Sequence, residues 1–298
     1  MKQIKYVLVL LAALVLMLST VISVSADPDK VDDVSIQAMV PEGGESSYLG
    51  GSVLVTGFEP SEGFSPGYCA QNGWTAFLVS STEGHIDTVN PASGTQHMRI
   101  SGDSSIGAGN LTGCFSPLLA APVTTPTIPM SQVLVDLYIS GTGGADYDVA
   151  PQSPTQGFLT ARVNFRFTGP IRVLDGGTFV DTGATWPVNT WFTLGITVDP
   201  ENDMIDYTID GTSIYTGSIV GGTIIEQVVL LSDNFHVTDD GDFDNLRVDN
   251  DYAPIPTDVS LTSFGESGNG SYALYFAPVL LLVLAGAFVT MRRKNEAA

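Results

Sequence analysis

Four carboxylates and one amide lie within seven positions near the end of the polar part of the chain. Asp239, Asp240, Asp242 and Asp244 supply the carboxylates and Asn245 the amide. Hard oxygen ligands of this kind suit calcium, although the spacing does not match an EF-hand loop. The stretch predicts a structural calcium site. The alternative is a solvated turn in which Asp244 caps the following strand.

Positive charge is scarce in this sequence and is concentrated in one segment. Arg162, Arg166 and Arg172 are half of the six basic residues between Asp27 and Ser271. Strand alternation places Arg162, Asn164 and Arg166 on one face, and Leu159, Ala161, Val163, Phe165 and Phe167 on the other. The polar face is therefore a candidate binding surface. The alternative is that these arginines pair across strands with acids such as Asp136.

Residues for catalysis are not apparent from their spacing. A glycosidase needs two carboxylates that project toward one bond, and the sequence has no Glu-x-Asp-x-Glu run. Asp203 and Asp206, which come nearest, are three apart on a strand and point to opposite faces. The scattered His85, His97 and His236 give neither a zinc site nor a catalytic triad. We therefore expect a protein that is not an enzyme, with a glycoside hydrolase or lyase as the lesser alternative.

The elements that must position these residues are β-strands. The stretch from Trp191 to Gly211 shows two strict alternations joined by a polar turn, which predicts a β-hairpin of a sandwich. Gly, Pro, Asn and Asp punctuate the gaps between strands, and no soluble helix is expected. The predicted strands are 53–58, 74–79, 85–89, 96–100, 133–140, 157–167, 171–174, 178–180, 224–232 and 243–248, with the hairpin at 191–211.

Both ends of the chain read as targeting segments. Lys2 and Lys5 precede an apolar run, and Val24-Ser25-Ala26 suits signal peptidase, so residues 1–26 are expected to be a signal peptide. Residues 272–291 form an apolar stretch of about 20 residues, enough to cross a bilayer as a helix. The basic tail at 292–298 then predicts that the β-domain faces outward, anchored at the cell surface. Asn269-Gly270-Ser271, the apolar run and the basic cluster together resemble bacterial C-terminal sorting signals.

Between these ends the chain is strongly acidic. Residues 27–271 carry six basic and 31 acidic side chains, a net charge of −25. A polyanion repels phosphate backbones, so nucleic acid is excluded as a partner. Cys69 and Cys114 are the only cysteines, and in an exported protein a single pair predicts a disulfide, with two free buried thiols as the alternative.

The order of several short motifs resembles that of a known family. Gly57 to Phe64, then Gln71 to Trp74, then Ser93 to Gln96, and later Phe243 to Val248, are similar to stretches of concanavalin A-like, laminin-G-like jelly-roll domains of bacterial surface proteins. The resemblance covers 52–249. It implies an all-β, two-sheet antiparallel jelly roll of about a dozen strands, and glycan or protein recognition. Residues 27–51 then form a flexible lead-in and 250–271 a stalk.

The resemblance also suggests where ligands would sit. First and last strands are neighbours in such modules, so Glu59, Asp242 and Asp244 are the expected calcium ligands. A concave sheet would use Arg162, Asn164 and Arg166 to bind sugar hydroxyls, with Tyr138 or Trp186 stacking on a ring. We therefore expect a non-catalytic binding module for a glycan or another surface protein. The alternative is a structural envelope protein without a soluble ligand.

Overall fold

A computed structural model describes residues 36–39, 52–77, 84–101, 111–121, 129–141, 145–233 and 240–252. The predicted signal peptide and the apolar C-terminal segment lie outside these ranges. Within the described residues, no helix combines the length and apolar character that a bilayer crossing requires. The helical structure found there is a single 3-10 turn, η2, at Pro60–Glu62.

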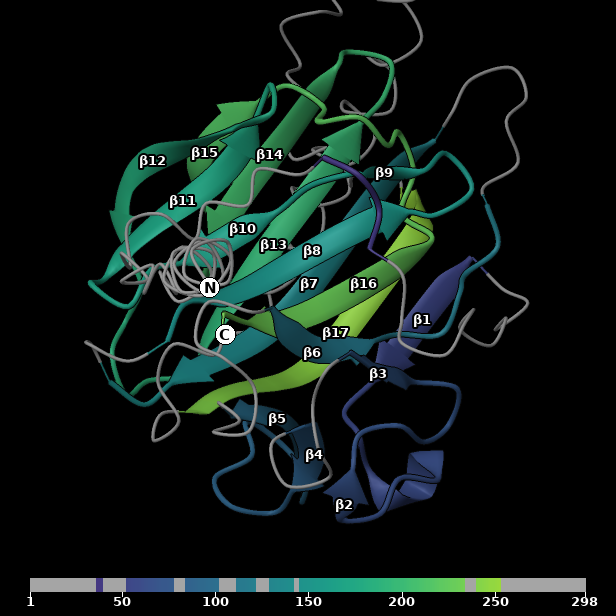
Figure 1. The fold of residues 1–298 in the computed structure, drawn as a ribbon, viewed down its shortest axis with the longest axis vertical. Coiled ribbons are helices and arrows are strands. Elements are labelled where there is room, and N and C mark those ends of the chain that lie inside the picture. The colour runs from purple at the N-terminus through teal and green to yellow at the C-terminus, as the bar shows by residue number, and fades with distance from the viewer. Residues whose placement is uncertain are drawn as a thin grey trace, which may run out of the picture. The chain divides into compact units, whose positions relative to one another are not determined.

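Two antiparallel sheets form the structure (Figure 1). The nine-stranded sheet has the order β15 (Thr212–Gly217), β14 (Met204–Ile209), β13 (Phe192–Asp199), β7 (Met130–Ile139), β17 (Asp240–Tyr252), β5 (His97–Ser101), β4 (Gly84–Asp87) and β2 (Gly67–Tyr68), with β1 (Val53–Thr56) also pairing with β17. The eight-stranded sheet has the order β12 (Thr178–Thr185), β11 (Pro170–Asp175), β10 (Val163–Phe165), β8 (Tyr147–Ser153), β16 (Gln227–Ser232), β6 (Thr112–Phe115) and β3 (Thr75–Phe77), with β9 (Phe158–Leu159) beside β8. The expected all-β class with two antiparallel sheets is confirmed.

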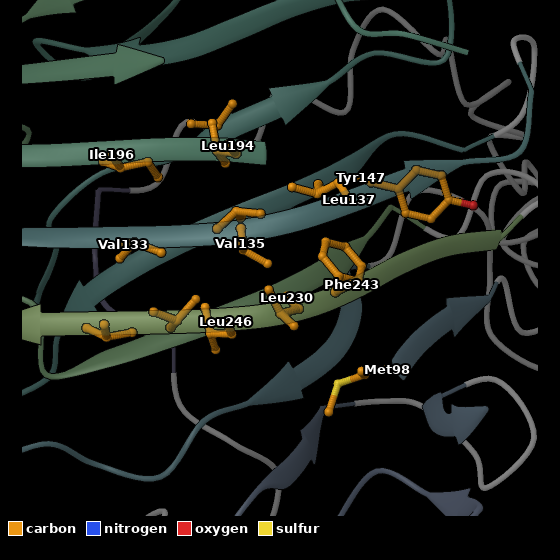
Figure 2. Packing of buried hydrophobic residues seen from close by; sticks show 14 of the residues in the cluster. Met98, Val133, Val135, Leu137, Tyr147, Leu194, Ile196, Leu230, Phe243 and Leu246 are labelled. Carbon is orange, nitrogen blue, oxygen red and sulfur yellow. The ribbon is translucent and has the colours of Figure 1, made fainter. Parts of the chain in front are cut away.

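The hydrophobic core lies between the sheets because alternate residues of each strand point inward. In β7, Val133, Val135 and Leu137 are completely buried, whereas the residues between them face the other side of the sheet. Leu230 of β16 faces them from the eight-stranded sheet (Figure 2). Each such side chain contributes about 1.5 to 3 kcal/mol of stability on burial.

The hairpin expected between Trp191 and Gly211 is present as β13 and β14. The register pairs Ile196 with Tyr207 and closes at Asp199 opposite Met204. The Asp199 carboxylate accepts the backbone N–H groups of Glu201 and Asn202 (3.1 and 3.2 Å), which fixes the turn. The polar residues between the two strands therefore form the turn that their composition predicts.

The prediction of a single strand at 157–167 is wrong. The structure has β9, then a break, then β10, because Thr160 and Ala161 both donate their backbone N–H to the Pro151 carbonyl of β8 (2.9 and 3.1 Å). The break moves Leu159 to the outer side of the sheet, away from Val163 in the core. Strand alternation cannot show such a break, because the residue types on both sides of it stay apolar.

Cys69 and Cys114 form a disulfide, as expected from the sequence. Cys69 follows β2 of the nine-stranded sheet, and Cys114 lies in β6 of the eight-stranded sheet. Both residues are fully buried. The bond therefore joins the two layers of the sandwich.

Candidate functional site

A cluster of acids and arginines covers one part of the outer face of the eight-stranded sheet. Tyr147 and Val149 of β8 point into the core, so Asp148 of β8 and Asp146, which directly precedes the strand, point outward. Asn164 of β10, Arg162 and Arg166 on either side of β10, and Arg172 of β11 lie beside them. We call this set the Asp/Arg cluster: Asp146, Asp148, Arg162, Asn164, Arg166 and Arg172.

Asp148 is the buried centre of the Asp/Arg cluster. One carboxylate oxygen accepts the Arg162 Nε–H (2.5 Å), and the other accepts the Asn164 Nδ2–H (2.5 Å). Register explains this contact, since Asn164 lies directly opposite Asp148 in the β8–β10 ladder. Arg162 and Asp148 are both almost fully buried, so this ion pair fixes the local geometry.

Asp146 lies nearer to solvent and has several donors around it. Its Oδ1 accepts the Phe167 backbone N–H (2.7 Å), and its Oδ2 lies 4.0 Å from Arg166 Nε and 3.8 Å from Arg172 Nη2. Burial raises the pKa of Asp146, while the Phe167 hydrogen bond opposes this shift and the Asp148 charge adds to it. The site thus holds two carboxylates with different surroundings.

The two carboxylates are close to one another. Asn164 Nδ2 lies 3.3 Å from Asp146 Oδ2 and 2.5 Å from Asp148 Oδ1. The two oxygens are therefore at most about 6 Å apart, joined through the Asn164 amide.

Aromatic rings support the guanidinium groups. The Phe179 ring lies 5.1 Å from Arg162 Cζ and 4.8 Å from Arg172 Cζ, and the Phe167 ring lies 5.7 Å from Arg166 Cζ. These cation–π contacts hold the arginines in place. The Arg166 and Arg172 side chains keep 16% and 12% of their surface exposed, so they form the rim that a ligand would meet first.

The five residues expected to bind ligand do not form one site. Arg162, Asn164 and Arg166 come together, but their acidic partners are Asp146 and Asp148 and not Asp136. Tyr138 and Trp186 lie elsewhere, as described next.

Tyr138 lies in β7 of the nine-stranded sheet, where its ring packs against Trp191 at 5.7 Å. Trp186 is 3% exposed and belongs to the core, with its Nε1–H donated to the Arg166 carbonyl (2.9 Å). Neither ring can stack on a sugar bound at the Asp/Arg cluster: Tyr138 belongs to the other sheet, and Trp186 is buried. Trp74 is a core residue as expected, whereas Trp191 is only half-buried.

Sequence reasoning missed Asp146 and Asp148. These two residues lie outside any Glu-x-Asp-x-Glu run, and β8 itself was not predicted. The available signal was Asp146-x-Asp148 within alternating apolar residues, which places two carboxylates on one face.

Two of the three expected calcium ligands hold the same loop, 92–96. Glu59 accepts the Thr95 and Gln96 backbone N–H groups (2.8 and 3.1 Å), and Asp244 accepts that of Ser93 (3.1 Å). A Cβ atom added at Gly57 would lie 3.6 Å from both Glu59 Cγ and Asp244 Oδ1, so the side chains of both residues border this glycine.

The third expected ligand, Asp242, lies apart from this pair. Its Oδ1 is 3.1 Å from His97 Nε2. In the described part of the chain, no group of three or more His, Cys, Asp or Glu side chains is arranged to hold a metal ion. Glu59 and Asp244, with the Asn245 Oδ1 beside Gly57, are an oxygen donor set whose chemistry fits calcium.

The two acids differ in their pKa. Burial raises the pKa of Asp244 to about 6, although hydrogen bonds from the backbone of Ser93 and Asn245 oppose the shift. Slight burial also raises the pKa of Glu59, but the hydrogen bonds from Thr95 and Gln96 outweigh it and hold the pKa below the ordinary value. A nearby cation would favour the ionised form of both.

No family model and no curated protein matches this chain. Among solved structures, a sialidase is similar at 10% identity with a TM-score of 0.50 over 71% of this chain, which spans only 19% of the sialidase chain. The Crh5 transglycosylase is similar at 14% identity and a TM-score of 0.44, over 72% of this chain and 92% of its own. The Bacillus licheniformis β-glucanase is similar at 13% identity and a TM-score of 0.42, over 67% of this chain and 98% of its own.

The likeness to the sialidase structure shows a shared β-sandwich fold. The expectation that the chain is not an enzyme is contradicted, because this fold occurs in a structure that is named as a sialidase. The missing Glu-x-Asp-x-Glu run is no ground for excluding catalysis. At these identities the likeness shows the fold alone and assigns no activity.

Proposed function

We propose that the Asp/Arg cluster binds a glycan on the outer face of the eight-stranded sheet. One observation carries this proposal. Three of the five basic side chains in the described residues, Arg162, Arg166 and Arg172, gather on one face of a very acidic protein and rest on aromatic rings. Guanidinium, carboxylate and amide groups are the partners that sugar hydroxyls and sugar carboxylates require.

Acidic sugars should bind more tightly than neutral sugars of the same size. Arg166 and Arg172 are at the accessible rim, and both guanidinium groups lie within 4.0 Å of Asp146 Oδ2. Guanidinium groups pair with carboxylates through two parallel hydrogen bonds.

The test is a glycan array probed with the purified full chain and with Arg166→Ala and Arg172→Ala. Each substitution should weaken binding to acidic glycans by roughly tenfold or more, since it removes a charged hydrogen-bond donor. Arg247→Ala is the matched control, because Arg247 is half exposed on the other sheet. Equal loss in all three variants, or no signal from folded protein, would contradict the proposal.

A second candidate function is cleavage or transfer of the bound glycan. The observation that favours it is the pair Asp146 and Asp148, whose oxygens lie within about 6 Å of each other. Asp146 would donate a proton to the leaving oxygen, for which a raised pKa is suited, while water, or a sugar hydroxyl in transfer, attacks the anomeric carbon and gives its proton to the Asp148 carboxylate. The same glycans are assayed for new reducing ends, and Asp146→Asn should abolish their release while binding persists. Release that survives this substitution would exclude Asp146 as the acid.

We also propose that Glu59 and Asp244 bind a structural calcium ion, as the sequence suggests. Two observations support this: Asp244 Oδ1, Asn245 Oδ1 and Glu59 Cγ surround Gly57, and the carboxylates of Glu59 and Asp244 both accept hydrogen bonds from the loop 92–96. The proposed setting is export, with the β-domain anchored at the cell surface by the apolar segment 272–291. This setting rests on the sequence patterns of the two ends.

A further inference from the structure

A second hydrophobic cluster lies outside the main core, on the outer face of the eight-stranded sheet. Its members are completely buried although they point away from the sandwich interior: Phe115, Ala150, Leu159, Leu174, Val229 and Leu231. Partly buried side chains cover them, and two of these, Ile36 and Met39, come from a short segment far away in the sequence. Figure 1 shows this segment as the purple trace beside β9.

Residues 36–39 bind this face through their backbone as an added strand would. Gln37 forms a bridge with Phe158, the Leu159 N–H donates to the Ile36 carbonyl (2.8 Å), and the Ala38 N–H donates to the Gly157 carbonyl (3.0 Å). The open edge of β9 is therefore paired. Extended peptides bind sheet edges in this way in many complexes.

A side-chain amide completes the groove. Gln152 Oε1 accepts the Met39 N–H (2.7 Å), and Gln152 Nε2 donates to the Met39 carbonyl (3.0 Å). Gln152 Nε2 also donates to Gln227 Oε1 (2.8 Å), and Gln227 Nε2 donates to the Ser116 carbonyl (2.7 Å). Gln152 and Gln227 are buried and held by these bonds, so the amide is positioned before a peptide arrives.

The side chains of the occupant are partly exposed. None of the residues 36–39 is fully buried, while the apolar side chains beneath them are. The occupant carries no charge, and its two apolar side chains, Ile36 and Met39, are three positions apart. Twelve residues separate Met39 from Ser52, so the segment is joined to β1 by a long connection.

We propose that this groove is a peptide-docking site, and that residues 36–39 are a displaceable occupant bound in cis. The partner that fits is an uncharged extended peptide with apolar side chains at its first and fourth positions. The backbone hydrogen bonds give affinity, and the two apolar contacts give specificity. This site lies on the same outer face as the Asp/Arg cluster, and Phe179 borders both. The peptide-docking proposal does not depend on glycan binding.

The test uses the full chain with Ile36→Asp and Met39→Asp, which vacates the groove. A labelled peptide with the sequence of residues 34–41 should bind this variant, as measured by fluorescence polarisation. The unsubstituted chain should bind the peptide roughly tenfold more weakly, because its own segment competes at an effective concentration on the order of 1 mM. A peptide with Asp in place of Ile36 and Met39 is the control and should not bind.

Gln152→Ala, added to the vacated variant, should weaken peptide binding by roughly tenfold through loss of two hydrogen bonds. A milder pair, Ile36→Ala with Met39→Ala, is measured in parallel in case the aspartates disturb folding. Far-UV circular dichroism and an intact disulfide show which variants are folded. Equal binding by the vacated and unsubstituted chains, or no binding by a folded vacated chain, would overturn the proposal.

Discussion

In this protein, strand alternation determines on which face of a sheet a side chain lies, but not which side chains it contacts. Alternation predicts that Arg162, Asn164 and Arg166 share a face, and they do. It cannot show that Asp148 binds the first two, since that contact depends on the β8–β10 register. The same limit applies to the calcium ligands. The local concentration of acids predicts that Asp242 and Asp244 act together. In the structure, Asp242 lies beside His97, whereas Asp244 accepts a hydrogen bond from the loop 92–96.

The raised pKa of Asp244 makes stability depend on pH. The folded state holds the proton up to about pH 6, whereas the unfolded chain releases it near 3.8. The free energy of unfolding therefore falls as the pH rises from about 4 to about 6, by up to about 3 kcal/mol. With chelator present, we expect a more stable protein at pH 5 than at pH 7.5 in urea unfolding.

Asp146 and Asp242 also have raised pKa values and therefore contribute to the pH dependence of stability. The variant Asp244→Asn separates the contribution of Asp244 from theirs. The difference between wild type and variant isolates the Asp244 part of the pH dependence. Calcium at pH 7.5 should stabilise the wild type and leave the variant little changed. A wild type whose stability is flat between pH 5 and 7.5, or matches that of the variant, would show that Asp244 is not responsible.

Strands with strict alternation could be predicted from the sequence, whereas strands without it were found only in part: β16 was expected, but β8 and β6 were not. The hairpin β13–β14 and the long strand β7 were expected because their apolar residues recur at every second position. β8, all of whose residues are buried, and β6, which contains Gly113 and Cys114, lack this pattern and were missed. Since β8 carries Asp148, the candidate site was found only in part. Its position depends on pairings between distant strands, which local patterns do not contain.

Gly113 shows how closely one pair of strands approaches. A Cβ atom there would lie 2.0 Å from the Leu230 carbonyl oxygen of β16, so β6 must shift to accept any side chain. Gly113→Ala should lower the free energy of unfolding by about 1 to 3 kcal/mol. Gly141→Ala is the control, because no atom lies within 4 Å of its Cβ position. Urea unfolding measures both, and equal stabilities would argue against the β6–β16 pairing.

At the scale of the whole molecule, the disulfide is a covalent link between two sheets that pack together through a hydrophobic core. Cys69 and Cys114 are 45 positions apart, and closing a loop of that length contributes about 3 to 4 kcal/mol by restricting the unfolded chain. The double variant Cys69→Ser with Cys114→Ser should lose this amount in urea unfolding. Wild type treated with reductant should unfold at the same urea concentration as the variant. No loss in either sample would mean that the bond adds no stability.

The pairing of β1 with β17 has a consequence for how this sandwich can be built into other proteins. Val53 lies opposite Asp249, and the Asn250 N–H donates to the Ser52 carbonyl (2.9 Å). The strand that opens the sandwich and the strand that closes it thus enter and leave at one point. A domain with adjacent ends can be inserted into a loop of a host protein or circularly permuted with little strain. This sandwich is therefore suited to insertion into a host protein as a unit. For circular permutation, the Gly176-Gly177 turn between β11 and β12 is a suitable place for the new ends.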